Sequence, residues 1–286
     1  MSTRPSSVDE LAGLLAERSY LAERGLATAL FLALSLGQPL LVEGEAGVGK
    51  TELAKALSAA LGTRLVRLQC YEGLDANQAL YEWDYARQLV HLRTLSDPAD
   101  AQDVFSERFL VERPLLAALR AGEDAVLLID EIDRADEEFE AFLLELLSEF
   151  QVSIPEVGVV RAVRPPIVVL TSNRTRELHD ALRRRCLYHW IDYPDLEREV
   201  DIVRTRAPDV SAALAAHVGA ATRRIRELDL VKRPGVAETI GWARAVSVLG
   251  AQLTAETAAD SLGAVVKDHD DVAVVTDRLA WVVDGG

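Results

Sequence analysis

Eight consecutive residues near the amino terminus have the types and spacing that surround a phosphate group. They read GEAGVGKT and comprise Gly44, Glu45, Ala46, Gly47, Val48, Gly49, Lys50 and Thr51. A short apolar run precedes them and a helical pattern follows, which is the setting such a motif requires. There, backbone N–H groups surround the phosphates, Lys50 reaches the β- and γ-phosphates, and the Thr51 hydroxyl holds Mg²⁺. The motif predicts an ATP and Mg²⁺ site, against the alternative of a ligand-free glycine turn.

A second group of chemically capable residues ends another apolar run, VLLIDEID at residues 126–133. Asp130 has the position from which a carboxylate holds the water shell of Mg²⁺, and Glu131 can orient or deprotonate an attacking water. The alternative is that these acids only favour the amino terminus of the next helix. We prefer that alternative for Asp136 and Glu137, and the catalytic interpretation for Asp130 and Glu131.

Asn173 ends a third apolar run, residues 165–173. A lone asparagine at the end of a strand is usually a turn residue. If this strand neighbours the others, however, the Asn173 amide can hydrogen-bond both the γ-phosphate and the attacking water. Cys186, His189 and His179 suggest a metal site, but they fall short of the ligands a structural zinc needs.

The elements that must position these residues alternate between strand and helix. Apolar runs at 38–44, 64–70, 125–130 and 165–173 predict buried strands, and helical segments separate them. This order predicts an α/β fold, in which a parallel sheet lies between helices. Strand patterns stop near Asp195, so we expect an α/β nucleotide-binding core over 1–194 and a helical lid domain over 195–286.

Residues 136–150 predict a helix whose apolar stripe faces the core. The stripe comprises Phe139, Phe142, Leu143, Leu146, Leu147 and Phe150. We expect Glu140, Glu145 and Glu149 to lie outside it. The residues that follow, 151–163, predict a hairpin around Pro155 whose tip could contact a partner.

Composition limits the compartment and the partners. The net charge of −15 would repel a phosphate backbone, so nucleic acid is not an expected partner. The two cysteines, Cys70 and Cys186, favour the reducing cytoplasm over a disulfide framework. The apolar stretch 25–37 is too short to span a bilayer and predicts a buried helix, without membrane insertion.

Taken together, the phosphate loop, LLIDEIDRA, TSN and LRRRC occur in the order found in AAA+ ATPases, which this chain resembles. The DEIDRA segment is similar to the MoxR branch. Longer segments, including LQCYEGLD, FEAFLLELLSEFQVSIPE and TSNRTRELHDALRRRCLYHWIDYP, resemble the MoxR-type ATPases that accompany molybdenum-containing carbon monoxide dehydrogenase. The resemblance begins near residue 20 and covers nearly all of the remaining chain.

The resemblance implies a homo-oligomeric ring, usually a hexamer, in which a neighbouring subunit supplies an arginine finger to each ATP. By residue matching the finger is Arg185, or alternatively Arg184. Arg183 can instead interact with the carboxyl end of its own helix. Many MoxR proteins carry a sensor arginine at the start of a lid helix, where this chain has Gly235 and Val236. Lys232 or Arg233 could replace that arginine.

The family further implies a chaperone-like ATPase in metalloenzyme maturation, with a von Willebrand factor A domain protein as partner and a molybdenum and copper enzyme as client. The alternative is a nucleotide-dependent regulatory switch with negligible turnover. Glu131 and the paired arginines argue for hydrolysis. A DNA-associated motor is disfavoured by the acidity of the chain.

Overall fold

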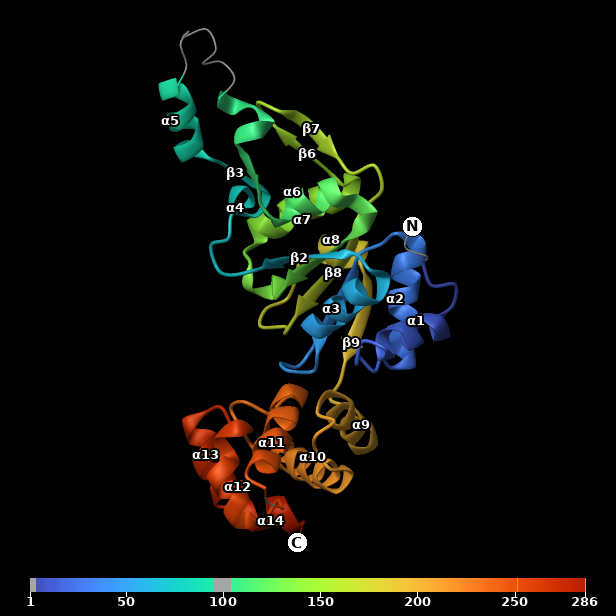
Figure 1. Ribbon diagram of the computed structural model, residues 1–286, viewed down its shortest axis with the longest axis vertical. Helices are drawn as coiled ribbons and strands as arrows, with labels where there is room; N and C mark the ends of the chain where they lie inside the picture. Colours follow the sequence, from blue (N-terminus) through green and yellow to red (C-terminus); the bar gives the residue numbers. More distant parts are fainter. Residues whose placement is uncertain (1–3, 95–103, 251, 286) are drawn as a thin grey trace. The chain divides into compact units, whose positions relative to one another are not determined.

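The computed structural model describes residues 4–94, 104–250 and 252–285, and the chain divides into two compact units (Figure 1). The first unit comprises Met1–Arg18, Ala22–Glu43 and Thr51–Trp190. The second comprises Ser19–Leu21, Gly44–Lys50 and Ile191–Gly286. Most of the phosphate loop therefore groups with the carboxyl-terminal residues.

The first unit is built on a sheet with the strand order β2-β5-β8-β1-β9. The strands are β1 (Leu40–Gly44), β2 (Arg64–Gln69), β5 (Ala125–Asp130), β8 (Ile167–Ser172) and β9 (Leu187–Ile191). β2 pairs with β5, β5 with β8, and β8 with β1, all in parallel. Every residue of β5 is buried, as expected for a strand that is covered on both faces. The predicted α/β fold is confirmed.

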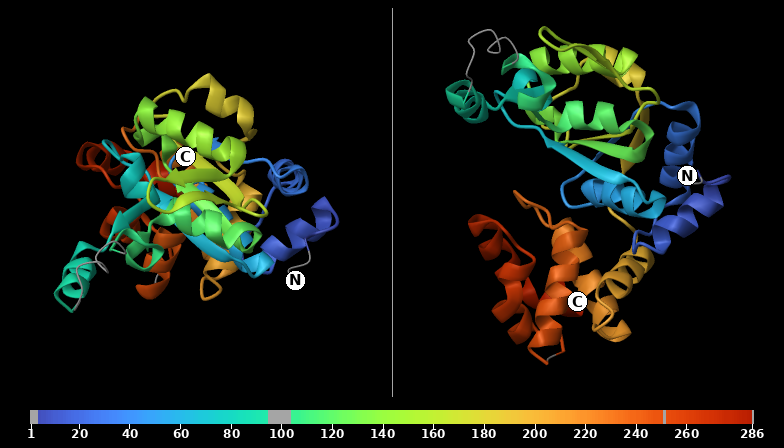
Figure 2. Two further views of the ribbon diagram at one scale, coloured as in Figure 1. Left: turned by 90° about the horizontal axis from the view of Figure 1, so that it is seen from above. Right: turned by 45° about the horizontal axis from the view of Figure 1, so that its top comes forward.

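Helices cover this sheet on both faces, which follows from the strand order. The chain crosses from β1 to the edge strand β2 in one direction and returns through β5 and β8 to β9 in the other. Because such crossovers are right-handed, helices of the two directions lie on opposite faces. One face carries α3 (Lys50–Leu61) and α2 (Arg24–Leu36), and the other carries α6 (Pro114–Ala121), α7 (Glu137–Glu149) and α8 (Asp180–Arg185) (Figures 1 and 2). Helix α1 (Val8–Ala16) packs on α2.

Helix α7 has the predicted apolar stripe but corrects one residue of the sequence analysis. Phe139, Leu143, Leu146 and Leu147 are buried, and Asp136 caps the helix by accepting a hydrogen bond from the Phe139 N–H. Glu140, expected outside the stripe, is instead 1% exposed. It lies on the stripe's flank, one residue after Phe139, and polar partners from the segment before α8 cover it.

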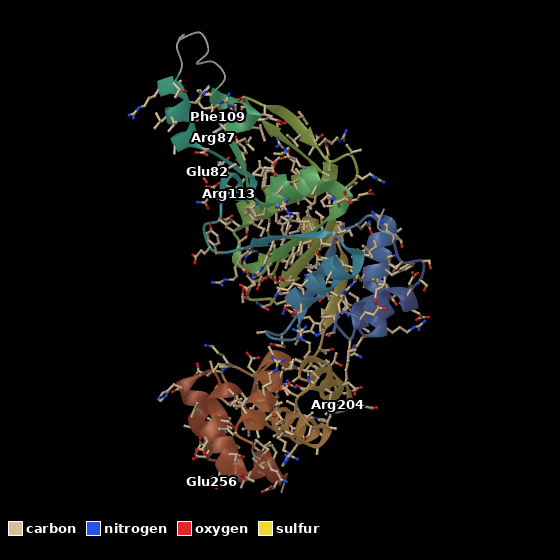
Figure 3. All side chains as sticks on the ribbon, viewed as in Figure 1. Glu82, Arg87, Phe109, Arg113, Arg204 and Glu256 are labelled. Atoms are coloured by element: carbon tan, nitrogen blue, oxygen red, sulfur yellow. The ribbon has the colours of Figure 1, made fainter. Side chains whose placement is uncertain are left out.

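Two small antiparallel elements extend from the first unit. The predicted hairpin around Pro155 forms from β6 (Gln151–Ile154) and β7 (Gly158–Arg161). The other element, between β2 and α6, contains α4 (Ala76–Leu80), β3 (Tyr81–Trp83), α5 (Tyr85–Thr94), η2 (Glu107–Phe109) and β4 (Leu110–Glu112). There, Phe109 is buried, and the Arg87 guanidinium lies 5.9 Å from its ring centre (Figure 3). The Arg108 guanidinium lies 4.8 Å from the same ring centre. An ion pair between Glu82 and Arg113 joins β3 to the residue after β4.

The second unit is helical. Its helices are α9 (Leu196–Arg206), α10 (Ala212–Glu227), α11 (Val236–Val248), α12 (Ala255–Ser261), α13 (His269–Thr276) and α14 (Leu279–Asp284). Trp242 of α11 is fully buried at their centre, and its indole N–H donates to Ser261 Oγ at 2.8 Å. This bond satisfies the polar atom of a large buried ring. Among the residues described in both units, no helix is long and apolar enough to cross a membrane.

Candidate active site

The phosphate loop leads into α3, whose first residue is Lys50. Lys50 is 7% exposed, and its Nζ donates to the backbone oxygens of Gly44 and Glu45, both at 2.7 Å. Gly47, at the middle of the loop, has φ +76°, in the left-handed region that glycine adopts without strain. A loop of this kind at the start of a helix can surround phosphates with backbone N–H groups, aided by the positive end of the helix.

Gly47 also contacts Gly235, the residue before helix α11, within the second unit. The Val236 N–H donates to Gly47 O at 3.0 Å. A Cβ atom added at Gly235 would lie 2.5 Å from Gly47 Cα, closer than real Cβ contacts allow. Position 235 is thus too close to the phosphate loop for the sensor arginine that the family pattern would place near here.

A cavity of about 420 Å³ adjoins this contact, also within the second unit. Its walls include Glu45 and Gly47 of the phosphate loop, the Tyr193 ring, and the cations Lys232 and Arg233. The mixture of apolar wall, aromatic ring and cations suits a ligand with a planar base and phosphates. Burial, followed by the nearby Glu45 carboxylate, raises the pKa of Tyr193, so its hydroxyl stays neutral.

Buried carboxylates hold the segment 230–235, which carries the two cations. Asp271 is 1% exposed and accepts hydrogen bonds from the Val231 and Lys232 N–H groups, each at 2.8 Å. Lys232 Nζ lies 3.8 Å from Asp268 Oδ2. Within the part of the chain that the structure describes, Arg233 makes no hydrogen bond or ion pair. Of the two predicted sensor candidates, Arg233 is therefore the one without an ion pair among the described residues.

A buried ion pair fixes the other end of the same segment. The Arg226 guanidinium donates to both carboxylate oxygens of Glu199, at 2.7 and 2.8 Å, and its Nε donates to Pro234 O at 2.7 Å. The guanidinium also lies 4.5 Å from the centre of the Tyr193 ring. Two-point pairing of this kind restricts orientation as well as distance. The segment is thus anchored at Val231 and Lys232 on one side and at Pro234 on the other.

The carboxyl ends of β5 and β8 bring the predicted acids together with two hydroxyl groups of the first unit. Asp130 is 2% exposed, and its Oδ1 accepts from Thr51 Oγ1 at 2.9 Å and from Thr171 Oγ1 at 2.6 Å. Arg67 of β2 donates to Asp130 Oδ2 from Nε at 3.0 Å and from the terminal nitrogen at 2.6 Å. The structure therefore places the Thr51 hydroxyl beside the Asp130 carboxylate.

Glu131 follows Asp130 in a left-handed backbone conformation, with φ +55°. This conformation is uncommon for a residue other than glycine and costs about 1 kcal/mol or more. The Glu131 N–H donates to Thr171 Oγ1 at 2.9 Å, which holds the turn. The Glu131 carboxylate accepts from Gln69 Nε2 at 3.1 Å and pairs with Arg134 at 3.2 Å. Glu131 is only partly buried, so its carboxylate remains accessible to water.

Asn173 directly follows β8, and β8 lies between β5 and β1, as the prediction for this residue required. The pairing sets Glu43 opposite Ser172 and Ile129 opposite Leu170. Asn173, which is half-buried, therefore leaves the sheet at the same carboxyl-terminal end as Asp130 and Glu43.

The three adjacent arginines end helix α8, and they differ in their contacts. The Arg183 guanidinium lies 5.9 Å from the centre of the Tyr188 ring. Arg184 and Arg185 are exposed, and neither has a hydrogen-bond or ion-pair partner within the described residues. Two cations thus project to solvent from a chain whose net charge is −15.

Sequence reasoning did not select Arg67, Gln69 and Thr171, which contact the acidic pair directly. Arg67 and Gln69 lie on β2, the outermost strand of the sheet, in which polar residues alternate with buried ones. A polar residue in the apolar run IVVLTS was the available signal for Thr171. A buried hydroxyl needs a partner, so Thr171 could have been assigned one, although not a particular one.

A phosphate loop at the start of α3, with acids at the carboxyl end of the strand β5 in a parallel sheet, defines a P-loop nucleotide-binding protein. Residues 39–186 match the AAA domain, dynein-related subfamily, over more than half of the 286 residues. The chain belongs to this family of AAA domains.

Individual relatives are more distant. The chain is 28% identical over 187 residues to the uncharacterized protein SH1500 of Staphylococcus haemolyticus (strain JCSC1435), covering 63% of this chain and spanning 64% of that protein. It is 25% identical over 265 residues to the gas vesicle ATPase GvpN of Haloferax mediterranei, covering 88% of this chain and 75% of the relative.

Among solved structures, the Thermotoga maritima RuvB Holliday junction branch migration motor has a TM-score of 0.50. The sequence identity is 20%, with 94% of this chain and 74% of that chain covered. At this identity the likeness shows the fold.

Proposed function

We propose that this chain is an ATPase that hydrolyses Mg-ATP within a homo-oligomeric, hexameric ring. The observation that carries the proposal is the Asp130 carboxylate, which contacts both Thr51 at the end of the phosphate loop and Thr171 before Asn173. One buried acid thereby joins the three motifs that ATP hydrolysis requires. The proposed division of labour is a nucleotide-binding core over 1–194 and a lid over 195–286.

The residues fit Mg²⁺, a cation that prefers oxygen ligands and usually binds through one or two protein groups together with phosphates and waters. The Thr51 hydroxyl and Asp130 carboxylate are two such groups, with their oxygens 2.9 Å apart. When bound, the ion supplies charge neutralisation at the phosphates. Arg67 occupies the other side of Asp130 and keeps its carboxylate oriented toward Thr51.

Within this proposal the chain's own residues have separate roles. Glu45, Ala46, Val48 and the loop glycines, Gly44, Gly47 and Gly49, surround the phosphates with backbone N–H groups, and Lys50 neutralises them. Glu131 accepts the proton of the attacking water. Asn173 orients that water against the γ-phosphate. Arg185, with Arg184 as the alternative, completes the neighbour's site, and Arg233 acts as the lid sensor in place of Lys232.

One specific observation favours the alternative of a nucleotide-dependent switch with negligible turnover. The Glu131 carboxylate is engaged by Gln69 and Arg134, and these contacts lower its availability as a base. Arg134 is exposed, and Gln69 and Glu131 are partly exposed, so a local side-chain change would free the carboxylate. We therefore favour the hydrolysing enzyme.

Steady-state ATP hydrolysis and ATP binding, measured on the same samples, test the proposal. We expect Lys50→Ala to lose binding or turnover, and Glu131→Gln to bind ATP while turnover falls about 10²-fold or more, the usual contribution of a general base. Glu137→Gln, an exposed acid at the start of α7, is the matched control and should behave like the wild type. Wild-type ATP binding without turnover would favour the switch, and normal turnover of Glu131→Gln would show that Glu131 is not the base.

For the biological role we propose chaperone-like maturation of a metalloenzyme, with a von Willebrand factor A domain protein as partner. The support is the resemblance of the longer sequence segments to the MoxR-type ATPases of molybdenum-containing carbon monoxide dehydrogenase. Further parts of the proposal are a cytoplasmic location and the absence of a nucleic-acid partner. The β6–β7 hairpin, with Val159 64% exposed beside its tip, is the proposed client contact.

Co-expression with carbon monoxide dehydrogenase tests this role. We expect the molybdenum and copper content of the purified client to fall when the wild type is replaced by Glu131→Gln. Unchanged metal content, with ATPase activity lost, would overturn the client assignment while leaving the ATPase assignment intact.

A further inference from the structure

Nine residues, Thr171 to His179, comprise the last two residues of β8 and the segment that leads from it to helix α8, and we refer to them as the connector. Four buried carboxylates of the first unit hold the connector along its length. They come from β1, β5, the turn η4 (Ile132–Arg134) and α7, and each is at most 3% exposed: Glu43, Asp130, Asp133 and Glu140. The arrangement joins the nucleotide-binding edge of the sheet to the helix that ends in Arg184 and Arg185.

The first half of the connector is held beside the predicted catalytic residues. Thr171 donates to Asp130, and Ser172 Oγ donates to Glu43 Oε1 at 3.3 Å. The N–H of Arg174, two residues further on, donates to Ser172 Oγ at 3.0 Å, and Arg174 has φ +55°. These contacts fix the backbone on both sides of Asn173.

The second half is held by Asp133 and Glu140, which no proposed catalytic role uses. Asp133 Oδ2 accepts from the Thr175 N–H at 2.9 Å and from Thr175 Oγ1 at 2.7 Å. Glu140 forms an ion pair with Arg176, and its Oε2 accepts from the His179 N–H at 2.8 Å. His179 is the N-cap of α8, so Glu140 holds the residue at which that helix begins.

Stability alone does not account for these two acids. Burying carboxylates is costly, and well-packed apolar residues usually stabilise a protein as well as a buried ion pair does. Asp133 Oδ1 is buried with no hydrogen-bond partner among the described residues, which adds to the cost. What directed hydrogen bonds supply, and apolar packing does not, is a fixed position and orientation for the backbone they hold.

We propose that Asp133 and Glu140 are positioning residues that act on the neighbouring subunit's ATP. By holding the connector and the start of α8, they set where Arg184 and Arg185 project from the subunit that carries them. The inference rests on the proposed trans-acting arginines. Its consequence is that a change at Glu140 impairs the site across the boundary and spares the nucleotide site of its own subunit.

Mixed rings test this directly. Glu131→Gln subunits bind ATP and keep their arginines, whereas Arg185→Ala subunits keep a complete nucleotide site, so mixing them restores hydrolysis at some boundaries. Adding Glu140→Gln to the Glu131→Gln subunit should reduce the restored turnover about 10²-fold, the effect expected when a catalytic group is misplaced by about 1 Å. Adding it to the Arg185→Ala subunit should leave turnover unchanged. Equal losses in both placements, or none in either, would overturn the proposal.

Glu145→Gln is the matched control, because Glu145 is an exposed acid on the same helix, and it should have no effect in either subunit. Hydrogen exchange provides a readout that is independent of turnover. In Glu140→Gln we expect faster exchange of the α8 amides, with Mg-ATP still protecting the phosphate-loop amides. Wild-type exchange in α8 would overturn the proposal. If the mixture of Glu131→Gln and Arg185→Ala subunits recovers no turnover although subunits exchange, the proposed trans role of the arginine is contradicted. Hydrogen exchange then still decides whether Glu140 positions α8.

Discussion

Cys70 shows how strongly the acidic edge of the sheet affects a single residue. The residue directly follows β2 and has no exposed surface. Burial, followed by the charges of Asp130, Asp133 and Glu131, raises the pKa of the Cys70 thiol from 9.0 to about 12. Because the thiolate is the reactive form, we expect no reaction of native Cys70 with an aromatic disulfide reagent near pH 8. Mass spectrometry after labelling measures this, and denatured protein, in which the thiol must react, is the control.

The same shift predicts a pH dependence of stability. The folded thiol titrates above the unfolded one, so its stabilising contribution is complete below about pH 9 and is lost as pH rises toward 12. We expect the free energy of unfolding of the wild type to fall over this range, and that of the Cys70→Ala variant to fall less. Urea unfolding at several pH values measures it, and equal slopes for both proteins would contradict the expectation.

Thr171 is the residue on which the geometry of the acidic pair depends. Replacing Thr171 by Val keeps the shape but leaves an Asp130 oxygen and the Glu131 N–H each without one partner. Such a loss costs about 1–3 kcal/mol for a buried group. We expect lower stability and a fall in kcat larger than any rise in KM, because the Glu131 turn loses its restraint. Thr171→Ser should restore both, and a purely structural role would leave kcat unchanged at temperatures where the variant is folded.

At the scale of elements, the contact between helix α11 and the phosphate loop depends on a missing side chain. Gly235→Ala adds a Cβ that would lie 2.5 Å from Gly47 Cα, so either the helix or the loop must move. Overpacking of this kind costs about 1–3 kcal/mol. We expect weaker ATP binding and lower stability, measured by calorimetry and thermal unfolding. Gly241→Ala, on the same helix with its nearest atom 4.0 Å away, is the control and should leave ATP affinity unchanged.

At the scale of the whole molecule, the proposed ring makes activity depend on concentration. Arginines supplied by a neighbour contribute about 10³ to 10⁵ in rate to phosphate hydrolysis in related mechanisms. We therefore expect turnover per subunit to rise steeply as subunits assemble, and Arg185→Ala to abolish this rise while ATP binding persists. Light scattering and hydrolysis on one dilution series measure both quantities. Turnover that is independent of assembly would contradict a trans role for Arg184 and Arg185.

The amino-acid sequence by itself determined the phosphate loop, the acids after β5, the strand that precedes Asn173 and the α/β class. These features can be predicted because a loop motif and a buried strand are each formed by residues that are consecutive in the sequence. The same local signals placed the apolar stripe of α7 but gave the wrong burial for Glu140. A charged residue beside the stripe is expected to be exposed when only the helix is considered.

Tertiary structure alone decided which groups contact those residues. Arg67 and Asp130 are 63 positions apart, and Glu140 and His179 are 39 apart, so no local pattern relates them. Gly235 is a glycine because Gly47 approaches it from a distant part of the chain. A sheet that sets β5 between β2 and β8 brings their ends to one edge, and this pairing turns separate polar residues into a site.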